Sequence, residues 1–537
     1  MDVLEKMLNQ RRELKAEINH LHPSMIDRMP VEVASNIFEL YVGDHSSDIF
    51  DCNPPLALQL GAVCQAWRRI AWSTPQLWAS IPLDLSVRPE RTWERALQRY
   101  TILEQLLSDW IARAGGFLLS IKLHSRHSIE LQNIEGLLPI IHIINSLSTR
   151  WKCLNLHLPM SVLPHFFVNT GQFNTASINK PRRNWWRGGI VKPTPKKVGL
   201  GAVRVKSLNI EWNNVTSLEI RIVYINEIFY ILRHSPSLVD CNISWLYLAG
   251  DLGDIPDRDL PFVHHKLERL LIKFDDPHCP PEFFSRVTLP YLKTLSCNFK
   301  DHTLPTDTFV SFLKRSGLPA KKSVSPGSMI SNPGLHGTNT NLKALSLIHP
   351  EIPGGGADLI QICNAVPGLK ELILMPTIDF GDTTFDVFYR ALANDTASIP
   401  DGLSQVATGN TVNCTTLEDS DLNDSEAPML LPALETFKCD QSFPWKFIPG
   451  FFLPFKGRKP SRCRPLKTVK VCYMTDAPAP VLSIDSKTLA LLHDLIDRGV
   501  DLSVINAHFP GETDLIQYPG SSLDDEEVVG GGTKTAS

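Results

Sequence analysis

One short frame, L-x-x-L-x-L, recurs in the second half of the chain and limits the possible folds more than any other feature. Starts at Leu267 and Leu292 lie 25 residues apart, the next interval is twice that, and Leu342 and Leu369 lie 27 apart. Repeats of this length usually supply one strand each and stack side by side, so the sequence predicts a solenoid with a parallel sheet. The six clear copies are Leu267-Leu270-Ile272, Leu292-Leu295-Cys297, Leu342-Leu345-Leu347, Leu369-Leu372-Leu374, Leu434-Phe437-Cys439 and Leu466-Val469-Val471.

Weaker copies and helical segments extend the pattern toward the N-terminus. Helix-like residues precede several frames, as in "INEIFYILRHSPSLVDCNI" and "ADLIQICNAVPGLKELIL". In "LEQLLSDWIARAGGFLLSIKLH" a helix should end at Gly115-Gly116 and a short strand should follow. The period is that of leucine-rich repeats, so we expect an α/β fold in which residues 100–510 form an irregular leucine-rich-repeat domain of parallel strands with outer helices. The weaker copies are Leu238-Cys241-Ile243, Val215-Leu218-Ile220 and Trp151-Leu154-Leu156.

Three segments interrupt the repeats and are expected to be loops, at 180–197, 320–340 and 394–427; residues 511–537 are expected to form a disordered tail. The first loop has seven Lys or Arg, no acid, and the pair Trp185 and Trp186. Such a segment could contact nucleic acid, but its prolines and glycines favour a surface loop or a nuclear-import signal. Salt-dependent nucleic-acid binding that disappears when the segment is deleted would distinguish the two.

The N-terminal part is predicted to be helical. Residues 1–22 place Leu4, Met7, Leu14, Ile18 and Leu21 at heptad spacing, as a weak coiled coil or as one amphipathic helix that lies on the next domain. Residues 23–85 are predicted to form a compact unit with two apolar-faced helices. The first helix carries Met29, Val33, Ile37, Leu40 and Tyr41 on one face, and the second carries Leu56, Leu60, Val63, Trp67 and Ile70.

The residues of this helical unit resemble the F-box pattern L-P-x-E…I-F…V-C-x-x-W-R. The matching stretches are Met29-Pro30-x-Glu32, Ile37-Phe38, Val63-Cys64-x-x-Trp67-Arg68 and Trp78. Met29 replaces the usual leucine, an exchange of similar volume. Later stretches, such as "RWKCLNLHLP", look like landmarks of the F-box-like proteins that are numerous in mushroom-forming fungi.

The resemblance implies a substrate receptor of an SCF-type cullin–RING ubiquitin ligase. Its F-box would bind a Skp-type adaptor, and through it a cullin, while the repeats would hold an unknown protein target. In that interpretation the chain is not an enzyme, because partner subunits transfer ubiquitin. The residues expected to bind the adaptor are Met29, Pro30, Ile37, Phe38, Leu60, Val63, Cys64 and Trp67.

Two alternatives to this interpretation stay open. The same residues could be the core of an ordinary helical cap on the repeats. The whole chain could also be a non-enzymatic scaffold whose F-box is degenerate and recruits no ligase, and Met29 is the only sequence support for that.

The composition of the chain reduces the number of functional classes that remain possible. The net charge of −4 gives no general attraction to nucleic acid or membranes, and the charged N-terminus lacks the apolar block of a signal peptide. We therefore expect no membrane segment and a cytoplasmic or nuclear location, with cysteines such as Cys64, Cys241, Cys297 and Cys439 reduced in the core.

No cofactor or metal is expected from the sequence. The glycines of "VGLGAVRV" and "PGGGADLI" do not complete a nucleotide-binding motif, and "DSDLND" lacks the glycine of a calcium loop. His278 and Cys279 beside two aspartates have no second ligand pair, so a polar loop is the simpler interpretation there.

Overall fold

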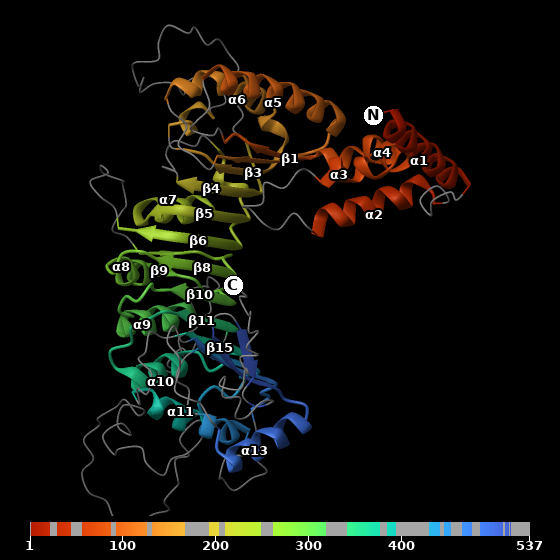
Figure 1. Ribbon diagram of the computed structural model, residues 1–537. Coiled ribbons are helices and arrows are strands. Elements are labelled where there is room, and N and C mark those ends of the chain that lie inside the picture. Colours follow the sequence, from red (N-terminus) through yellow and green to blue (C-terminus); the bar gives the residue numbers. More distant parts are fainter. Residues whose placement is uncertain are drawn as a thin grey trace, which may run out of the picture. The chain divides into compact units, whose positions relative to one another are not determined.

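The structure is a computed structural model of the 537-residue chain. It describes residues 2–21, 29–44, 56–86, 93–125, 131–159, 161–166, 193–202, 210–248, 261–317, 341–375, 384–393, 429–440, 445–452, 464–474, 484–508, 511–514 and 516. The chain divides into two compact units, Met1–Val223 with Glu227–Leu238, and Tyr224–Asn226 with Val239–Ser537. Both units combine parallel strands with helices, so the expected α/β class is correct (Figure 1).

The first unit begins with helices and continues into a parallel sheet. Its helices are α1 (Asp2–Leu21), α2 (Val31–Asp44), α3 (Leu56–Val63), α4 (Gln65–Ser73), α5 (Trp93–Ala114) and α6 (Leu131–Ser146), with short 3-10 turns η3 (Pro75–Trp78), η4 (Ser148–Arg150), η5 (Leu163–His165) and η7 (Trp212–Asn214). Its strands, in spatial order, are β1 (Ser80–Asp84), β2 (Leu119–His124), β3 (Trp151–His157), β4 (Lys197–Ala202) and β5 (Ser217–Tyr224). Helix α7 (Ile225–His234) follows β5 directly.

One row of apolar side chains crosses the sheet of the first unit in register. Leu83 pairs with Leu123, which pairs with Leu156, then Leu200 and Ile220. All five are buried, as expected for residues that point to the same face of a sheet. Burial of such a row fixes the register, since a slip by one residue would turn every apolar side chain outward.

The second unit repeats the same construction. Its sheet runs β6 (Asp240–Tyr247), β8 (Arg269–Phe274), β10 (Thr294–Asn298), β11 (Ala344–Ile348), β12 (Glu371–Met375), β13 (Thr436–Asp440), β14 (Thr468–Met474) and β15 (Asp501–His508), all parallel, then the antiparallel β16 (Gly511–Asp514). Two short strands, β7 (Phe262–Val263) and β9 (Val287–Thr288), pair separately. The helices are α8 (Cys279–Arg286), α9 (Thr306–Gly317), α10 (Gly355–Ala365), α11 (Asp386–Leu392), α13 (Ser486–Asp497) and the 3-10 turn η8 (Trp445–Phe452).

The core of the second unit lies between its helices and its sheet. Helices α8 to α11 follow one another along one side of the strands (Figure 1). The central residues of five frames, a cysteine and four leucines, stand in one continuous row, Cys241, Leu270, Leu295, Leu345 and Leu372. Each is at most 1% exposed, so the repeated leucines form the core, as the repeat predicts.

All nine frames found in the sequence are strands of these sheets, which confirms the parallel sheet. The helix before Gly115 is also confirmed: α5 ends at Ala114, and Gly115 has a φ of +54°, the left-handed conformation expected of a residue that ends a helix.

Four boundaries predicted from the sequence are wrong. The helical unit ends earlier than residue 85, because Ser80–Asp84 is the first strand of the sheet. Gly511–Asp514 is a strand and Ile516 is 1% exposed, so the tail predicted to be disordered starts too early. Lys197, assigned to a loop, begins β4, and the predicted second helix is broken at Cys64.

The sequence did not predict strand β4, because the glycines of this stretch resemble part of a nucleotide-binding motif and are unusual in a strand. A Cβ on Gly199 would lie 2.6 Å from Cγ of Asn155 on β3, so glycine is needed for the close approach of that side chain. Residues 180–192, 320–340, 394–427 and 517–537 of the predicted loops and tail lie outside the described residues.

Candidate functional site

The first three helices after α1 enclose a small core of their own. Phe38 of α2 is 1% exposed, and its ring lies 4.9 Å from the ring of Trp67 on α4. Ser35 and Thr74 share a hydrogen bond of 2.8 Å between their hydroxyls, and Thr74 donates to the carbonyl of Ile70. These contacts fix α2 against α4, so the outer face of α2 is held in a defined orientation.

A cluster of indole rings connects this core to α5. Trp78 is fully buried, donates to the carbonyl of Ala71 at 2.8 Å, and lies edge-on to Trp72 and Trp110. The guanidinium of Arg113 stands 5.1 Å and 4.7 Å from the rings of Trp72 and Trp78. Cation–π and edge-to-face contacts of this kind stabilise the position of the helices on the sheet that follows.

The break at Cys64 separates α3 from α4. Cys64 has extended backbone angles, and its sulfur accepts a hydrogen bond from the backbone N–H of Trp67 at 3.5 Å. Sulfur is a weak acceptor, but the position is that of an N-cap residue. The cysteine is only partly buried, so the expectation of a core position is wrong here, whereas Cys241, Cys297 and Cys439 are buried as predicted.

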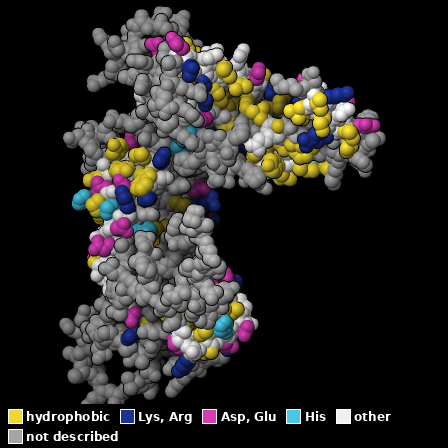
Figure 2. Space-filling view, viewed as in Figure 1, with side chains coloured by type: hydrophobic (Ala, Val, Ile, Leu, Met, Phe, Trp, Pro, Cys, Tyr) yellow, Lys and Arg dark blue, Asp and Glu magenta, His cyan; other side chains and the backbone are white. Residues whose placement is uncertain are grey.

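Apolar side chains lie exposed on the outer sides of these helices. On α2, Val33, Ile37, Leu40 and Tyr41 are 43–69% exposed and recur at the spacing of one helical face. On α3, which packs against α2, Leu58 is 39% and Val63 60% exposed. Figure 2 shows hydrophobic side chains gathered over these helices on the face in view. We name these six residues the α2–α3 apolar surface.

The eight residues predicted to bind an adaptor separate into two groups. Pro30, Ile37 and Val63 are exposed and Met29 is partly exposed, so these four can reach a partner. Phe38 and Leu60 are 1% and 5% exposed and belong to the core beneath the surface. Cys64 starts α4, and Trp67 supports Phe38 from the side. Sequence periodicity did not predict that Leu58 belongs to the exposed surface. Leu58 follows the buried Ala57 and is turned away from the core.

Helix α1 carries a second set of exposed apolar residues. Leu4, Met7, Leu14 and Ile18 are 50–66% exposed. The helix itself is as predicted, and whether it forms a weak coiled coil or lies on the next domain stays a prediction.

The described residues provide no constellation for metal chemistry. Among them no group of three or more His, Cys, Asp or Glu side chains could hold a metal ion. Cys279, noted in the sequence beside His278, is fully buried, and burial raises the pKa of its thiol to about 12. A thiol with such a pKa stays protonated and is a poor nucleophile or ligand near neutral pH.

Comparisons with known proteins give no identification. The sequence matches no model of a protein family, and no curated protein matches it. Among the described helices, none has both the length and the apolar character needed to cross a membrane. The site must therefore be interpreted from its own residues, and its best-defined feature is the α2–α3 apolar surface.

Proposed function

We propose that the chain is the substrate-recognition subunit of an SCF-type cullin–RING ubiquitin ligase. In this proposal the α2–α3 apolar surface binds a Skp-type adaptor, which connects the chain to a cullin, and the leucine-rich-repeat-like sheet binds the protein to be ubiquitinated. The chain itself performs no chemistry, because partner subunits transfer ubiquitin.

The observation that carries the proposal is the exposure of Ile37 and Val63 within the F-box-like residues. A small helical unit that had only to cap the repeats would gain stability by burying these side chains, at about 25 cal/mol for each Å² removed from water. Instead Ile37 and Val63 are exposed, while Phe38 and Leu60 are buried and Trp67 packs against Phe38. Apolar helix faces on a rigid support are the form used for binding between helices of two proteins.

The repeat sheet offers a suitable surface for a target. Along β10, β11 and β12 every second side chain is buried, and the alternate ones, such as Ser296, Ser346 and Ile373, are partly exposed. The alternate positions of other strands carry charged side chains paired across neighbouring strands, such as Arg269 with Asp240 and Lys438 with Glu371, so the surface of the second unit is both polar and charged. Sheet surfaces of this kind are common protein-binding surfaces in repeat proteins.

Co-expression with a Skp-type adaptor tests the proposal. The wild-type chain should co-purify with the adaptor, and the double variant Ile37→Asp, Val63→Asp should not. Each anchor of such an interface costs roughly 2 kcal/mol or more on truncation, and a buried charge costs more. Circular dichroism should show both chains folded.

A matched control separates a specific surface from general loss of apolar area. Leu491 on α13 is 45% exposed, the same as Ile37, so Leu491→Asp should leave co-purification intact. If the wild-type chain is folded but does not bind the adaptor, the result would contradict the proposal and favour the alternative of a scaffold protein with a degenerate F-box.

A further inference from the structure

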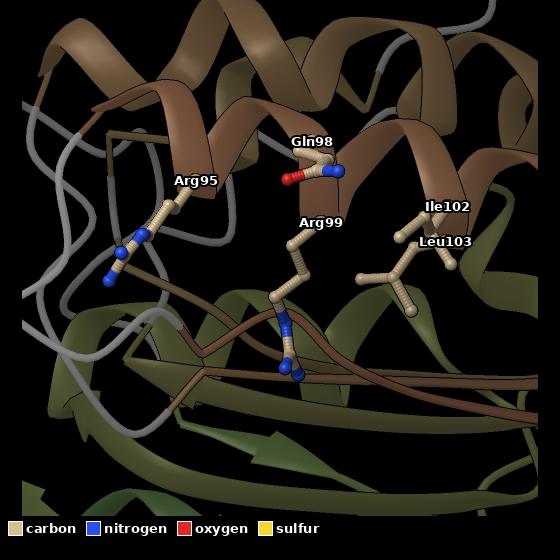
Figure 3. Close-up of a pocket in the computed structure, with 5 residues that line it drawn as sticks. All are labelled: Arg95, Gln98, Arg99, Ile102 and Leu103. Atoms are coloured by element: carbon tan, nitrogen blue, oxygen red, sulfur yellow. The ribbon is translucent and has the colours of Figure 1, made fainter.

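The groove along α5 in the first unit has its described walls on one helix only. Arg99 in this groove donates to the carbonyl of Asp84 at 3.1 Å, so it serves to hold α5 on β1. The described residues that line the groove all lie on α5 (Figure 3): Arg95, Gln98, Arg99, Ile102 and Leu103. A surface to which several elements contribute lies instead on the sheet of the second unit.

Lys273 lies on an indole ring near the carboxyl end of β8. Its ammonium stands 3.7 Å from the ring centre of Trp245 on the adjacent strand β6. Among the described residues it forms no ion pair or hydrogen bond with a carboxylate. An indole attracts a cation but carries no charge that neutralises it, so Lys273 can bind an anion as well.

A second lysine stands beside the same ring. Lys300 follows β10, and its ammonium is 5.2 Å from the ring centre of Trp245. Its ion-pair partner is Asp275, whose carboxylate also forms a hydrogen bond with the hydroxyl of Tyr247. Asp275 is therefore occupied by two donors, and the two lysines around the indole exceed it in charge.

Lys273 is also the first of four side chains that stand at one level on neighbouring strands. The register pairs Lys273 of β8 with Asn298 of β10, Asn298 with Ile348 of β11, and Ile348 with Met375 of β12. All four are partly exposed, whereas the residue before each of them in its strand is buried. The four side chains therefore share the face of the sheet opposite the core, and we name them the β8–β12 row.

Backbone hydrogen bonds fix the chain just beyond this row. Lys300, Asp301 and His349 have φ values of 50°, 64° and 48°, left-handed conformations that are unfavourable for residues with a side chain. The N–H of Asp301 donates to the carbonyl of His349 at 2.8 Å, and their side chains lie 3.7 Å apart. The N–H of His349 donates to the carbonyl of Met375 at 2.6 Å. Strained residues persist where such contacts hold them, commonly at binding sites, so a partner meets a surface already in place.

The two ends of the row differ in chemistry. Asn298 beside Lys273 uses its side-chain oxygen to accept from the N–H of Lys300 at 3.0 Å, which leaves its amide N–H groups as donors. A cation and an amide donor together suit a carboxylate. Ile348 and Met375 at the other end are apolar, and methionine adapts its shape to a partner. The tryptophan and tyrosine beside the lysines are of the types that contribute most to protein interfaces, which favours a protein partner.

The width of the row sets the spacing that such a partner needs. Neighbouring strands are about 4.8 Å apart, so Ile348 and Met375 lie roughly 10 and 14 Å from Lys273 across the sheet. An extended chain advances about 3.3 Å per residue, so these distances correspond to about three or four residues.

We propose that the β8–β12 row binds an extended segment of a partner protein in which an aspartate or glutamate lies about three or four residues from a large apolar residue. The carboxylate accepts from Lys273 and Asn298, and the apolar side chain packs on Ile348 and Met375. In the proposed function, on which this assignment of a partner rests, the segment belongs to the protein to be ubiquitinated.

Fluorescence anisotropy of a labelled peptide with the full chain tests the proposal. The peptide Gly-Ser-Asp-Glu-Gly-Ser-Leu-Ser-Gly should bind wild type, and its Asn-Gln analogue should bind about ten-fold more weakly, the loss expected for a hydrogen bond to a charged group. Lys273→Gln should weaken binding of the acidic peptide by a similar factor. It should leave binding of the Asn-Gln analogue unchanged.

Charge reversal separates recognition from a structural role of Lys273. Lys273→Glu should bind a Lys-Lys analogue of the peptide more tightly than wild type does, whereas a damaged sheet would gain affinity for no peptide. Lys314→Gln is the matched control, because Lys314 is exposed on α9, outside the row, and its loss changes the net charge equally. Circular dichroism checks that each variant is folded.

The apolar end of the row has its own test. Met375→Ser should weaken binding of the leucine-containing peptide and leave unchanged the weaker binding of an analogue with glycine in place of leucine. Equal losses for the two peptides would show that the leucine does not lie on Met375.

Three results would overturn the proposal. They are no binding of the acidic peptide to folded wild type at millimolar concentration, equal losses in Lys314→Gln and Lys273→Gln, or tighter binding of a single-stranded oligonucleotide than of the peptide. Co-purification with the adaptor uses no residue of the β8–β12 row. It should therefore stay intact in Lys273→Gln, and a chain that binds the adaptor but not the peptide would refute this proposal alone.

Discussion

The residue that most clearly couples this fold to pH is His157, at the end of β3. Its side chain is 8% exposed, and burial, with the nearby His124 as a smaller cause, lowers its pKa from 6.5 to about 4. The unfolded chain therefore binds a proton at pH 5 that the folded chain does not, so stability is lost as the pH falls from about 6.5 toward 4. The full shift corresponds to about 3 kcal/mol.

Urea unfolding at pH 7 and pH 5 measures this effect. His157→Gln should reduce the difference in unfolding free energy between the two pH values, because glutamine has no proton to bind. His265→Gln, at an exposed histidine, should keep the wild-type difference. If His157→Gln retained that difference as well, the histidine would not be its source.

Buried polar residues such as His157 are the part of the fold that the sequence did not reveal. Arg464 is another: it is 5% exposed, and its guanidinium donates to the carbonyls of Leu430 and Leu392. These partners lie 34 and 72 residues away in the chain. The leucine frame predicts which apolar residues are buried, but a long-range hydrogen bond to a backbone carbonyl leaves no periodic trace.

At the scale of elements, the packing of α3 on α4 depends on Gly61. A Cβ at this position would lie 1.9 Å from Cζ3 of Trp72, whose ring is in turn fixed against Trp78 and Arg113. Gly61→Ala should therefore displace the indole and destabilise the unit by about 1–3 kcal/mol, as overpacking does. Thermal unfolding and tryptophan fluorescence measure the loss.

Gly116 provides the comparison, because a Cβ there meets nothing within 4 Å. Gly116→Ala should leave both the unfolding midpoint and the fluorescence near wild type. Equal effects of the two substitutions would mean that helix propensity or chain entropy, and not the contact with Trp72, decides the outcome.

The same helices show where sequence periodicity stops being informative. Apolar spacing from Leu56 to Ile70 predicted one helix, and the structure has two, because Cys64 interrupts it with an extended backbone. Cysteine is not among the strong N-cap residues, so the sequence carried no signal for the break. The break between α3 and α4 determines which apolar residues are exposed at the candidate site. Val63 at the end of α3 is 60% exposed, while Leu60 faces the core.

At the scale of the whole molecule, repetition made most of the fold predictable. Each frame buries the same positions, so pattern and register agree from strand to strand in both units. Two strands at the C-terminal end of the sheet, β15 and β16, escaped prediction because neither carries the complete frame. Strand β15 lacks the first leucine, because Gly499, with a φ of +89°, stands in that place, and β16 is antiparallel and outside the repeat.

Strand β16 ends the sheet of the second unit and protects its edge. Residues Ile505 to His508 of β15 pair with Gly511 to Asp514, and the carboxylate of Asp514 also accepts from the N–H of Val504. An open strand edge offers unpaired N–H and C=O groups to other chains, so removing β16 should cause self-association. A chain that stops at His508 should form oligomers in size-exclusion chromatography with light scattering, whereas one that stops at Tyr518 should behave as the full chain.

A charged residue on the uncovered edge strand distinguishes strand pairing from unfolding as the cause of self-association in the truncated chain. Val504 is buried and Ile505 beside it is only partly buried, so Ile505→Lys leaves the core intact and places a cation at the open edge. Lysine on an edge strand opposes pairing with a second chain, and this variant of the His508 truncation should regain the oligomeric state of the full chain. Continued aggregation of that variant would indicate that β16 is needed for folding of the unit, because unfolded chains associate whatever residue stands at position 505.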